Sequence, residues 1–85
     1  MTEFTLDQLR SALRACAGED PSVDLDGDIA GTEFADLGYD SLALMQTASH
    51  LSRTLGLRLS EDALAEAPTP AAFVDAVNAR LSQPA

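Results

Sequence analysis

Basic residues are scarce in this 85-residue chain: lysine is absent, and five arginines stand against 14 acidic residues, which gives a formal net charge of −9 at pH 7. Because phosphate binding needs clustered Lys and Arg, nucleic acid is a poor partner for such a chain. An anionic membrane surface is disfavoured for the same reason. A basic patch on a partner protein is the natural complement of this charge, although solubility alone explains it equally well.

The residues that most often carry chemistry are also scarce. Cys16 is the only cysteine and His50 the only histidine. A lone cysteine excludes an intramolecular disulfide, and we interpret Cys16 as a buried structural thiol. The first residues lack a basic segment and a long apolar run, so they do not resemble a signal peptide, and no stretch has the length to span a membrane. We therefore expect a cytoplasmic protein that is a monomer.

The composition favours helices. Tryptophan is absent, there are three Phe and one Tyr, and much of the 46% hydrophobic content is Ala and Leu, which are good helix formers. Eighty-five residues make one small domain, residues 1–85, which must place its apolar side chains economically.

Capping signals predict where the helices lie. Thr5 and Gln8 have the spacing of a capping box, and Gly18 ends the apolar stripe that follows them, which predicts a helix over residues 6–17. Signals of the same kind predict three more helices. The fold class expected is all-α, a four-helix bundle of three main helices and one short helix with a long first loop. The apolar stripe of the first helix is Leu6, Leu9, Leu13 and Cys16. The second helix is expected to start at Asp40 or Ser41 and to run to Leu55, with Gly56 as its stop, and Ser60 is expected to cap the short third helix. The fourth helix is expected to start at Thr69 and Pro70, with an apolar face of Phe73, Val74, Val77 and Leu81.

The connection over residues 19–40 is long and acidic. It holds eight of the 14 acids and no base, and a loop of this length is usually functional or packed by its own side chains. Its run Asp24-x-Asp26-x-Asp28 begins like a calcium loop, but neither possible register matches the EF-hand pattern, so stable calcium binding is not expected. The residues expected to pin the loop to the core are Val23, Leu25, Ile29, Phe34 and Leu37.

The second predicted helix has apolar residues on two sides. Leu42 points about 150° away from the core stripe and Met45 about 90° away from it, while Gln46 shares the sector of Leu42. Apolar side chains near solvent beside an acidic loop indicate a partner surface. The core stripe is Leu44, Ala48, Leu51 and Leu55.

Ser41, at the start of this helix, has three interpretations. The first is an N-cap or first-turn serine. The second, a catalytic nucleophile, fails because His50 lies about 180° around the helix and about 13 Å along it, so no base is within reach. The third is a modification site, where an attached phosphodiester would lie near the positive end of the helix dipole. Asp40 and the loop acids would repel that phosphate, but they could hold Mg²⁺ while a transferase delivers the group.

The run Asp36-Leu-Gly-Tyr-Asp-Ser-Leu42 resembles the acyl carrier protein signature, whose centre is Gly-x-Asp-Ser-Leu. The expected order of helices matches that family along the whole chain. The run from Gly38 to Met45 is most similar to discrete carriers of type II polyketide synthases, since Ala43 stands where fatty acid carriers usually have an acid. The resemblance implies that Ser41 carries 4′-phosphopantetheine from coenzyme A, with Asp40 beside it, and that the arm holds malonyl and growing β-ketoacyl chains as thioesters.

The resemblance also implies partners: a phosphopantetheinyl transferase, a malonyl-loading acyltransferase, the ketosynthase–chain length factor pair, and ketoreductase, cyclase and aromatase enzymes. Contact in this family centres on the second helix and the loop before it. The family usually has an acid where Gln46 stands, so the charge for docking would come from other residues. The candidate partner-binding residues are Asp36, Leu42, Met45, Gln46, Glu61 and Asp62.

Other functions are open at this point. A peptidyl carrier usually lacks an Asp before the modified serine, so Asp40 argues against it. A fatty acid carrier is closer, and Ala43 and Gln46 disfavour it. A cofactor-free acidic helical module that binds a basic partner would not need Ser41. An enzyme is not expected, because no catalytic pair is available from one His, one Cys and a serine at a helix start.

Overall fold

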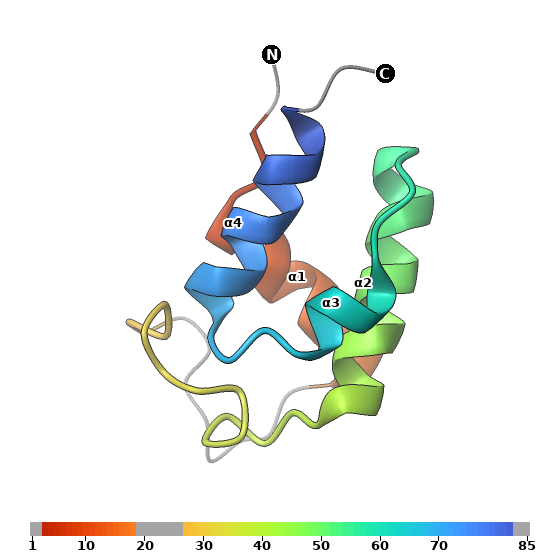
Figure 1. Cartoon of the computed structure of the whole chain (residues 1–85). Helices are drawn as coiled ribbons and strands as arrows, with labels where there is room; N and C mark the ends of the chain where they lie inside the picture. The colour runs from red at the N-terminus through yellow and green to blue at the C-terminus, as the bar shows by residue number, and fades with distance from the viewer. Residues whose placement is uncertain (1–2, 19–26, 83–85) are drawn as a thin grey trace.

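The computed structural model describes residues 3–18 and 27–82 of the chain. Within these residues there are four helices and no strand, so the predicted all-α fold class is confirmed (Figure 1). None of these helices is both long and apolar enough to cross a bilayer. The helices are α1, Leu6–Ala17; α2, Ser41–Leu55; α3, Glu61–Ala65; and α4, Pro70–Leu81.

Each helix begins at the capping residue that local chemistry favours. In α1 the predicted capping box is present: the Thr5 hydroxyl accepts the Gln8 N–H at 3.2 Å, and the Gln8 side chain accepts the Thr5 N–H at 2.8 Å. Ser60 caps α3, and Thr69 caps α4 ahead of Pro70. Gly56 ends α2 in the left-handed region at φ 67°, where a side chain would be strained.

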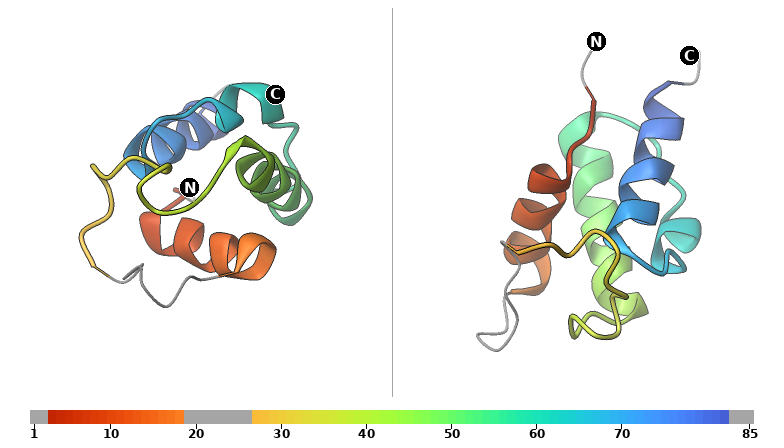
Figure 2. Two further views of the ribbon diagram at one scale, coloured as in Figure 1. Left: turned by 90° about the horizontal axis from the view of Figure 1, so that it is seen from below. Right: turned by 90° about the vertical axis from the view of Figure 1, so that its left-hand side faces the viewer.

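The helices form a bundle in which α1 runs opposite to α2 and α4 (Figures 1 and 2). α2 packs against α1 and α3, and α1 packs against α4. The bundle therefore has two ends: α2 and α4 begin at one, and α1 begins at the other. Ser41 lies at the end where α2 begins.

Phe34 lies in the middle of the core, although it comes from the loop. Its ring makes edge contacts with Phe73 of α4 at 6.0 Å and with Tyr39 at 6.5 Å between centroids. The predicted core residues of the helices are largely buried. The buried members are Leu9, Leu13, Leu44, Ala48, Leu51, Phe73 and Val77, and the partly buried ones are Leu6, Leu55, Val74 and Leu81.

Cys16 differs from its prediction, because it is half-buried rather than buried. It lies in the last turn of α1, two residues before the C-cap Gly18, where fewer neighbours cover a side chain than in the middle of the bundle. In the stripe of α1, Leu9 and Leu13 are therefore fully buried, and Leu6 packs against the core while partly exposed.

The described part of the first loop is pinned as predicted. Ile29, Phe34 and Leu37 are buried, whereas Val23 and Leu25 lie outside the described residues. Two backbone hydrogen bonds join the loop to the segment around the start of α4: Phe34 N–H to the Pro68 carbonyl at 2.9 Å, and Ala71 N–H to the Ala30 carbonyl at 3.0 Å. The loop thus crosses the end of the bundle at which α2 begins (Figure 2).

The opposite end is closed by a pair of bonds between residues 74 positions apart. The Asn78 amide accepts the Phe4 N–H at 2.8 Å and donates to the Phe4 carbonyl at 2.9 Å. The Phe4 side chain is buried beside them. These bonds fasten the segment before α1 to the last turns of α4.

Candidate functional site

Ser41 is the first residue of α2, and its side chain is exposed. The N-cap is Asp40, which has extended backbone (φ −99°, ψ −178°) and accepts the Ala43 N–H through its carboxylate at 2.9 Å. Of the two local roles predicted for Ser41, N-cap or first-turn serine, the structure shows the first-turn serine, because Asp40 is the N-cap. Within the described part of the chain, the Ser41 hydroxyl makes no hydrogen bond, so it is free to react.

The loop before Ser41 is held by side chains that alternate between core and solvent. Phe34, Leu37 and Tyr39 are buried, whereas Asp36 and Asp40 are exposed. Turn hydrogen bonds stiffen the same segment, including Leu37 N–H to the Glu33 carbonyl at 3.2 Å and Tyr39 N–H to the Phe34 carbonyl at 3.0 Å. The serine is consequently presented by an ordered turn rather than by a loose one.

Two further features fix this turn. Gly38 has φ +85°, a conformation that favours glycine, and it lets the chain turn from the Leu37 side toward Tyr39. The Tyr39 hydroxyl donates to the Gly18 carbonyl at 3.0 Å, which connects the turn to the end of α1. The position of Ser41 therefore depends on α1 as well as on its own helix.

An open pocket of about 360 Å³ lies beside Ser41. Its volume falls within the range of small-ligand sites, about 300–1,000 Å³. Most of the lining is apolar and comes from the loop, the first turn of α2 and the segment after α3, with Glu33 and Asp40 as the only acids. The lining residues are Glu33, Phe34, Ala35, Tyr39, Asp40, Ser41, Leu44, Ala65, Ala67 and Pro68.

The outer face of α2 beyond Ser41 is partly apolar, as predicted. Leu42 is 63% exposed and is the one large hydrophobic side chain in the described residues that is so open. Met45 is half-buried and Gln46 is exposed. With Asp36 exposed in the loop, the residues around the start of α2 are two apolar side chains, one amide and one acid.

Glu61 and Asp62 lie in the first turn of α3, not on α2 or in the loop before it. The Leu59 N–H donates to the Ser52 hydroxyl at 3.3 Å, so the start of α3 lies beside the later part of α2. Ser52 is eleven residues beyond Ser41, or about 16 Å along the helix axis. Ala65, at the other end of α3, lines the pocket beside Ser41, so α3 leads from this part of α2 back toward the serine.

The described residues offer neither a metal centre nor a catalytic pair. No group of three His, Cys, Asp or Glu side chains in residues 3–18 and 27–82 could hold a metal ion. The aspartates at 24 and 26 of the rejected calcium pattern lie outside that part of the chain. His50 is half-buried and lines a groove between α1 and α2, nine residues along the helix from Ser41.

Thr47 is a residue that sequence analysis missed. It is fully buried in the core face of α2, where its hydroxyl donates to the Ala43 carbonyl at 2.9 Å. The bond satisfies a polar group that would otherwise be costly to bury. Position 47 lies three residues after Leu44 and four before Leu51, which places it beside the core stripe, and this spacing was the signal.

Comparison with known proteins agrees with this geometry. The family model for a phosphopantetheine attachment site matches residues 7–77. The granaticin polyketide synthase acyl carrier protein of Streptomyces violaceoruber is 53% identical over 78 residues, which cover 92% of each chain. This chain belongs to the acyl carrier proteins of type II polyketide synthases.

Other relatives match the carrier over nearly its whole length. The oxytetracycline polyketide synthase acyl carrier protein of Streptomyces rimosus is 46% identical over 82 residues, 96% of this chain and 86% of the relative. The solved structure of the actinorhodin holo acyl carrier protein from Streptomyces coelicolor superposes with a TM-score of 0.83 and 42% identity, over 99% of this chain and 98% of the other. Proteins of this family are carriers rather than catalysts.

The carrier's cofactor is 4′-phosphopantetheine, and the residues at the start of α2 fit it. A phosphodiester on the first turn of a helix lies near unpaired backbone N–H groups and the positive end of the helix dipole. An exposed hydroxyl without a hydrogen bond stands at that place, with the apolar pocket beside it. When attached, the cofactor supplies a thiol that holds acyl chains as thioesters.

Proposed function

We propose that Ser41 is the attachment residue, and that the carrier delivers malonyl and growing β-ketoacyl chains from that position to the enzymes of a type II polyketide synthase. One observation supports the site above all: Ser41 is exposed on the first turn of α2, and its hydroxyl has no hydrogen bond within residues 3–18 and 27–82, while Asp40 takes the capping role. We further propose that residues 1–85 act as one carrier domain, monomeric and cytoplasmic.

The attachment is a phosphoryl transfer from coenzyme A. The Ser41 oxygen forms a bond to the phosphorus next to the pantetheine, the bond inside the pyrophosphate breaks, and 3′,5′-adenosine bisphosphate leaves. The hydroxyl proton passes to a base of the transferase, since the neighbouring Asp40 carboxylate is engaged as the cap of α2. One oxygen of the Asp40 carboxylate accepts the Ala43 N–H, and the other is available to help hold Mg²⁺ during transfer.

The proposed partners are a phosphopantetheinyl transferase, a malonyl-loading acyltransferase, the ketosynthase–chain length factor pair, and ketoreductase, cyclase and aromatase enzymes. Leu42, Met45 and Gln46 would form the centre of the contact, and Asp36 would supply charge near Ser41. Glu61 and Asp62 would supply charge to partners that also contact α3. Docking of this kind is steered by charge and stays weak, because a carrier has to leave each partner.

Intact mass tests the attachment site. The purified protein, shown to start without the arm, is incubated with coenzyme A, Mg²⁺ and a broad-specificity phosphopantetheinyl transferase, beside a Ser41→Ala variant. We expect the wild type to gain one phosphopantetheine and the variant none. The exposed position of Ser41 makes the variant a fair control, with its fold checked by circular dichroism. A gain on the variant would move the site elsewhere, and no gain on folded wild type would favour a cofactor-free module.

The contact surface needs a separate test. Leu42→Ser removes the exposed apolar side chain, and a change in the free energy of unfolding within about 0.5 kcal/mol is expected because the site is open. The apparent KM of a ketosynthase–chain length factor for the malonyl-loaded carrier should rise. Thr54→Ala, at an exposed position near the far end of α2, is the matched control and should leave KM unchanged. Equal KM values for both variants would refute the proposed surface.

A further inference from the structure

One hydrogen bond joins the two ends of the first loop. The Tyr39 hydroxyl donates to the Gly18 carbonyl at 3.0 Å, across 21 positions of the chain. Gly18 is the C-cap of α1, and Tyr39 stands two residues before Ser41. The bond therefore fastens the turn that presents the serine to the end of a helix that itself packs against α2.

The Tyr39 side chain is held in place by its packing. It is buried, and its ring makes an edge contact with Phe34, at 6.5 Å between centroids. Its backbone N–H donates to the Phe34 carbonyl at 3.0 Å. Because ring and backbone are both fixed to Phe34, the hydroxyl meets the Gly18 carbonyl when the turn and α1 have this relative position. The bond thus couples the place of the turn to the place of α1.

The reacting serine lies where the loop and α2 meet. Along the chain, Ser41 stands between Asp36 in the loop and Leu42 on the helix, and both of these are exposed candidates for partner contact. An enzyme that contacts both holds the loop and the helix at once. A shift of the turn relative to α2 would move the Ser41 hydroxyl in the enzyme's site while every contact side chain is kept. Group transfer is sensitive to such shifts, since a displacement of about 1 Å can cost about 10²-fold in rate.

We propose that Tyr39 is a positioning residue for phosphopantetheine transfer, and that its hydroxyl, bonded to Gly18, sets the place of Ser41 relative to the contact surface. The proposal rests on Ser41 as the attachment residue. In the transfer the Ser41 oxygen bonds to phosphorus, 3′,5′-adenosine bisphosphate leaves, and the proton passes to the transferase. Tyr39 takes no part in these bonds, because its hydroxyl is directed at Gly18, and it acts through the turn alone.

Tyr39→Phe keeps the ring and removes only the hydroxyl. In loading assays with a phosphopantetheinyl transferase, we expect kcat for the variant to fall at least about fivefold, with KM changed by less than about twofold. The ¹H–¹⁵N signals of the Ser41 and Leu42 amides should shift. Tm should fall by about 4–8 °C, because one part-buried hydrogen bond is lost, so the assay is run at 25 °C on folded protein.

Two control variants separate position from stability and from contact. Asn78→Ala loses two hydrogen bonds at the opposite end of the bundle, so it should lower Tm at least as much as Tyr39→Phe. Its kcat for loading and its Ser41 and Leu42 amide signals should nevertheless equal those of the wild type. Leu42→Ser removes a contact side chain and should raise KM for the transferase while kcat is kept.

The outcomes separate the two proposals. If folded wild type gains no phosphopantetheine, the attachment residue itself is contradicted. A loaded wild type with equal kcat for Tyr39→Phe overturns the positioning role alone. Slow loading of both Tyr39→Phe and Asn78→Ala also overturns it, because stability would then govern the rate. A rise in KM without a fall in kcat would make Tyr39 part of the contact surface instead.

Discussion

Asp40→Ala is expected to lower the free energy of unfolding by about 1–2 kcal/mol. The Asp40 carboxylate accepts the Ala43 N–H at 2.9 Å, and loss of an N-cap side chain costs about 1 kcal/mol, with a range of 0.5–2. A negative charge at a helix N-terminus adds about 0.3–1 kcal/mol. Both contributions come from an exposed side chain, so the loss stays near that sum and leaves the fold intact.

Asp40→Asn separates the cap from the charge. Asparagine caps a helix about as well as aspartate, so this variant should lose only about 0.5 kcal/mol. For a domain of 60–100 residues each kcal/mol shifts Tm by about 4–8 °C. Thermal unfolding followed by circular dichroism should therefore place Asp40→Asn close to the wild type and Asp40→Ala clearly below it.

The same two variants test the part that the carboxylate plays in loading. Phosphopantetheine transfer, followed by intact mass over time, should be slower for Asp40→Asn than for the wild type, because the variant keeps the cap but loses the acid beside Ser41. Equal Tm for Asp40→Ala and wild type would refute the capping argument. Equal loading rates for Asp40→Asn and wild type would show that Asp40 serves the helix only.

Three further substitutions test the packing that holds the site. Phe34→Ala should cost about 3–5 kcal/mol, because a buried ring in contact with Phe73 is lost. Urea unfolding measures this cost, and a loss below about 1 kcal/mol would contradict the place of the loop in the core. Asn78→Ala should lower the free energy of unfolding by about 1–3 kcal/mol and speed hydrogen exchange at the Phe4 amide. Unchanged exchange at that amide would show that the paired bonds do not form in solution. Gly56→Ala should lower the free energy of unfolding by about 1 kcal/mol, because the added Cβ meets no neighbour and the cost comes from placing a side chain at φ +67°. Thermal unfolding measures this cost, and a stabilised variant would show that the left-handed cap is absent.

The sequence predicts the helices well because their ends are decided by neighbouring residues. The capping box at Thr5 and Gln8, the glycine after α2 and the Thr69-Pro70 start of α4 each act within a few positions. At the start of α2 the same local argument has two answers, because aspartate and serine are both good caps. Only the structure shows that Asp40 takes the cap and leaves Ser41 free.

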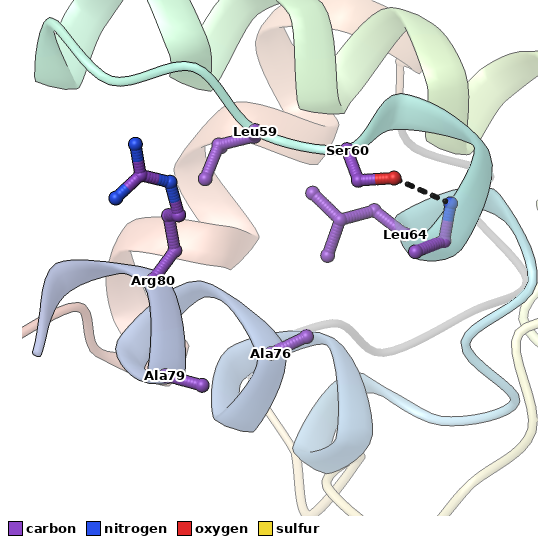
Figure 3. Close-up of a pocket in the computed structure, with 7 residues that line it drawn as sticks. Leu59, Ser60, Leu64, Ala76, Ala79 and Arg80 are labelled. Atoms are coloured by element: carbon purple, nitrogen blue, oxygen red, sulfur yellow. Dashed lines mark hydrogen bonds between the residues drawn. The ribbon is translucent and has the colours of Figure 1, made fainter. Parts of the chain in front are cut away.

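Features that depend on distant residues could not be predicted in the same way. The pair Phe4 and Asn78 lies 74 positions apart, and nothing local in either segment indicates the other. The pocket lined by Leu59, Leu64 and Arg80 (Figure 3) depends on how α3 is placed relative to α4, which a pattern of apolar residues does not define. Leu42, by contrast, was predicted as exposed, because helical geometry alone places it opposite the core stripe.

The paired bonds between Phe4 and Asn78 have a practical consequence. They keep the segment before α1 and the last turns of α4 together, at the end of the bundle away from Ser41 (Figure 1). An affinity tag, a fusion protein or a solid support joined at either terminus would thus stand on the side away from incoming enzymes. The carrier could be immobilised on a bead through its termini and still be loaded, extended and unloaded by successive enzymes washed over it.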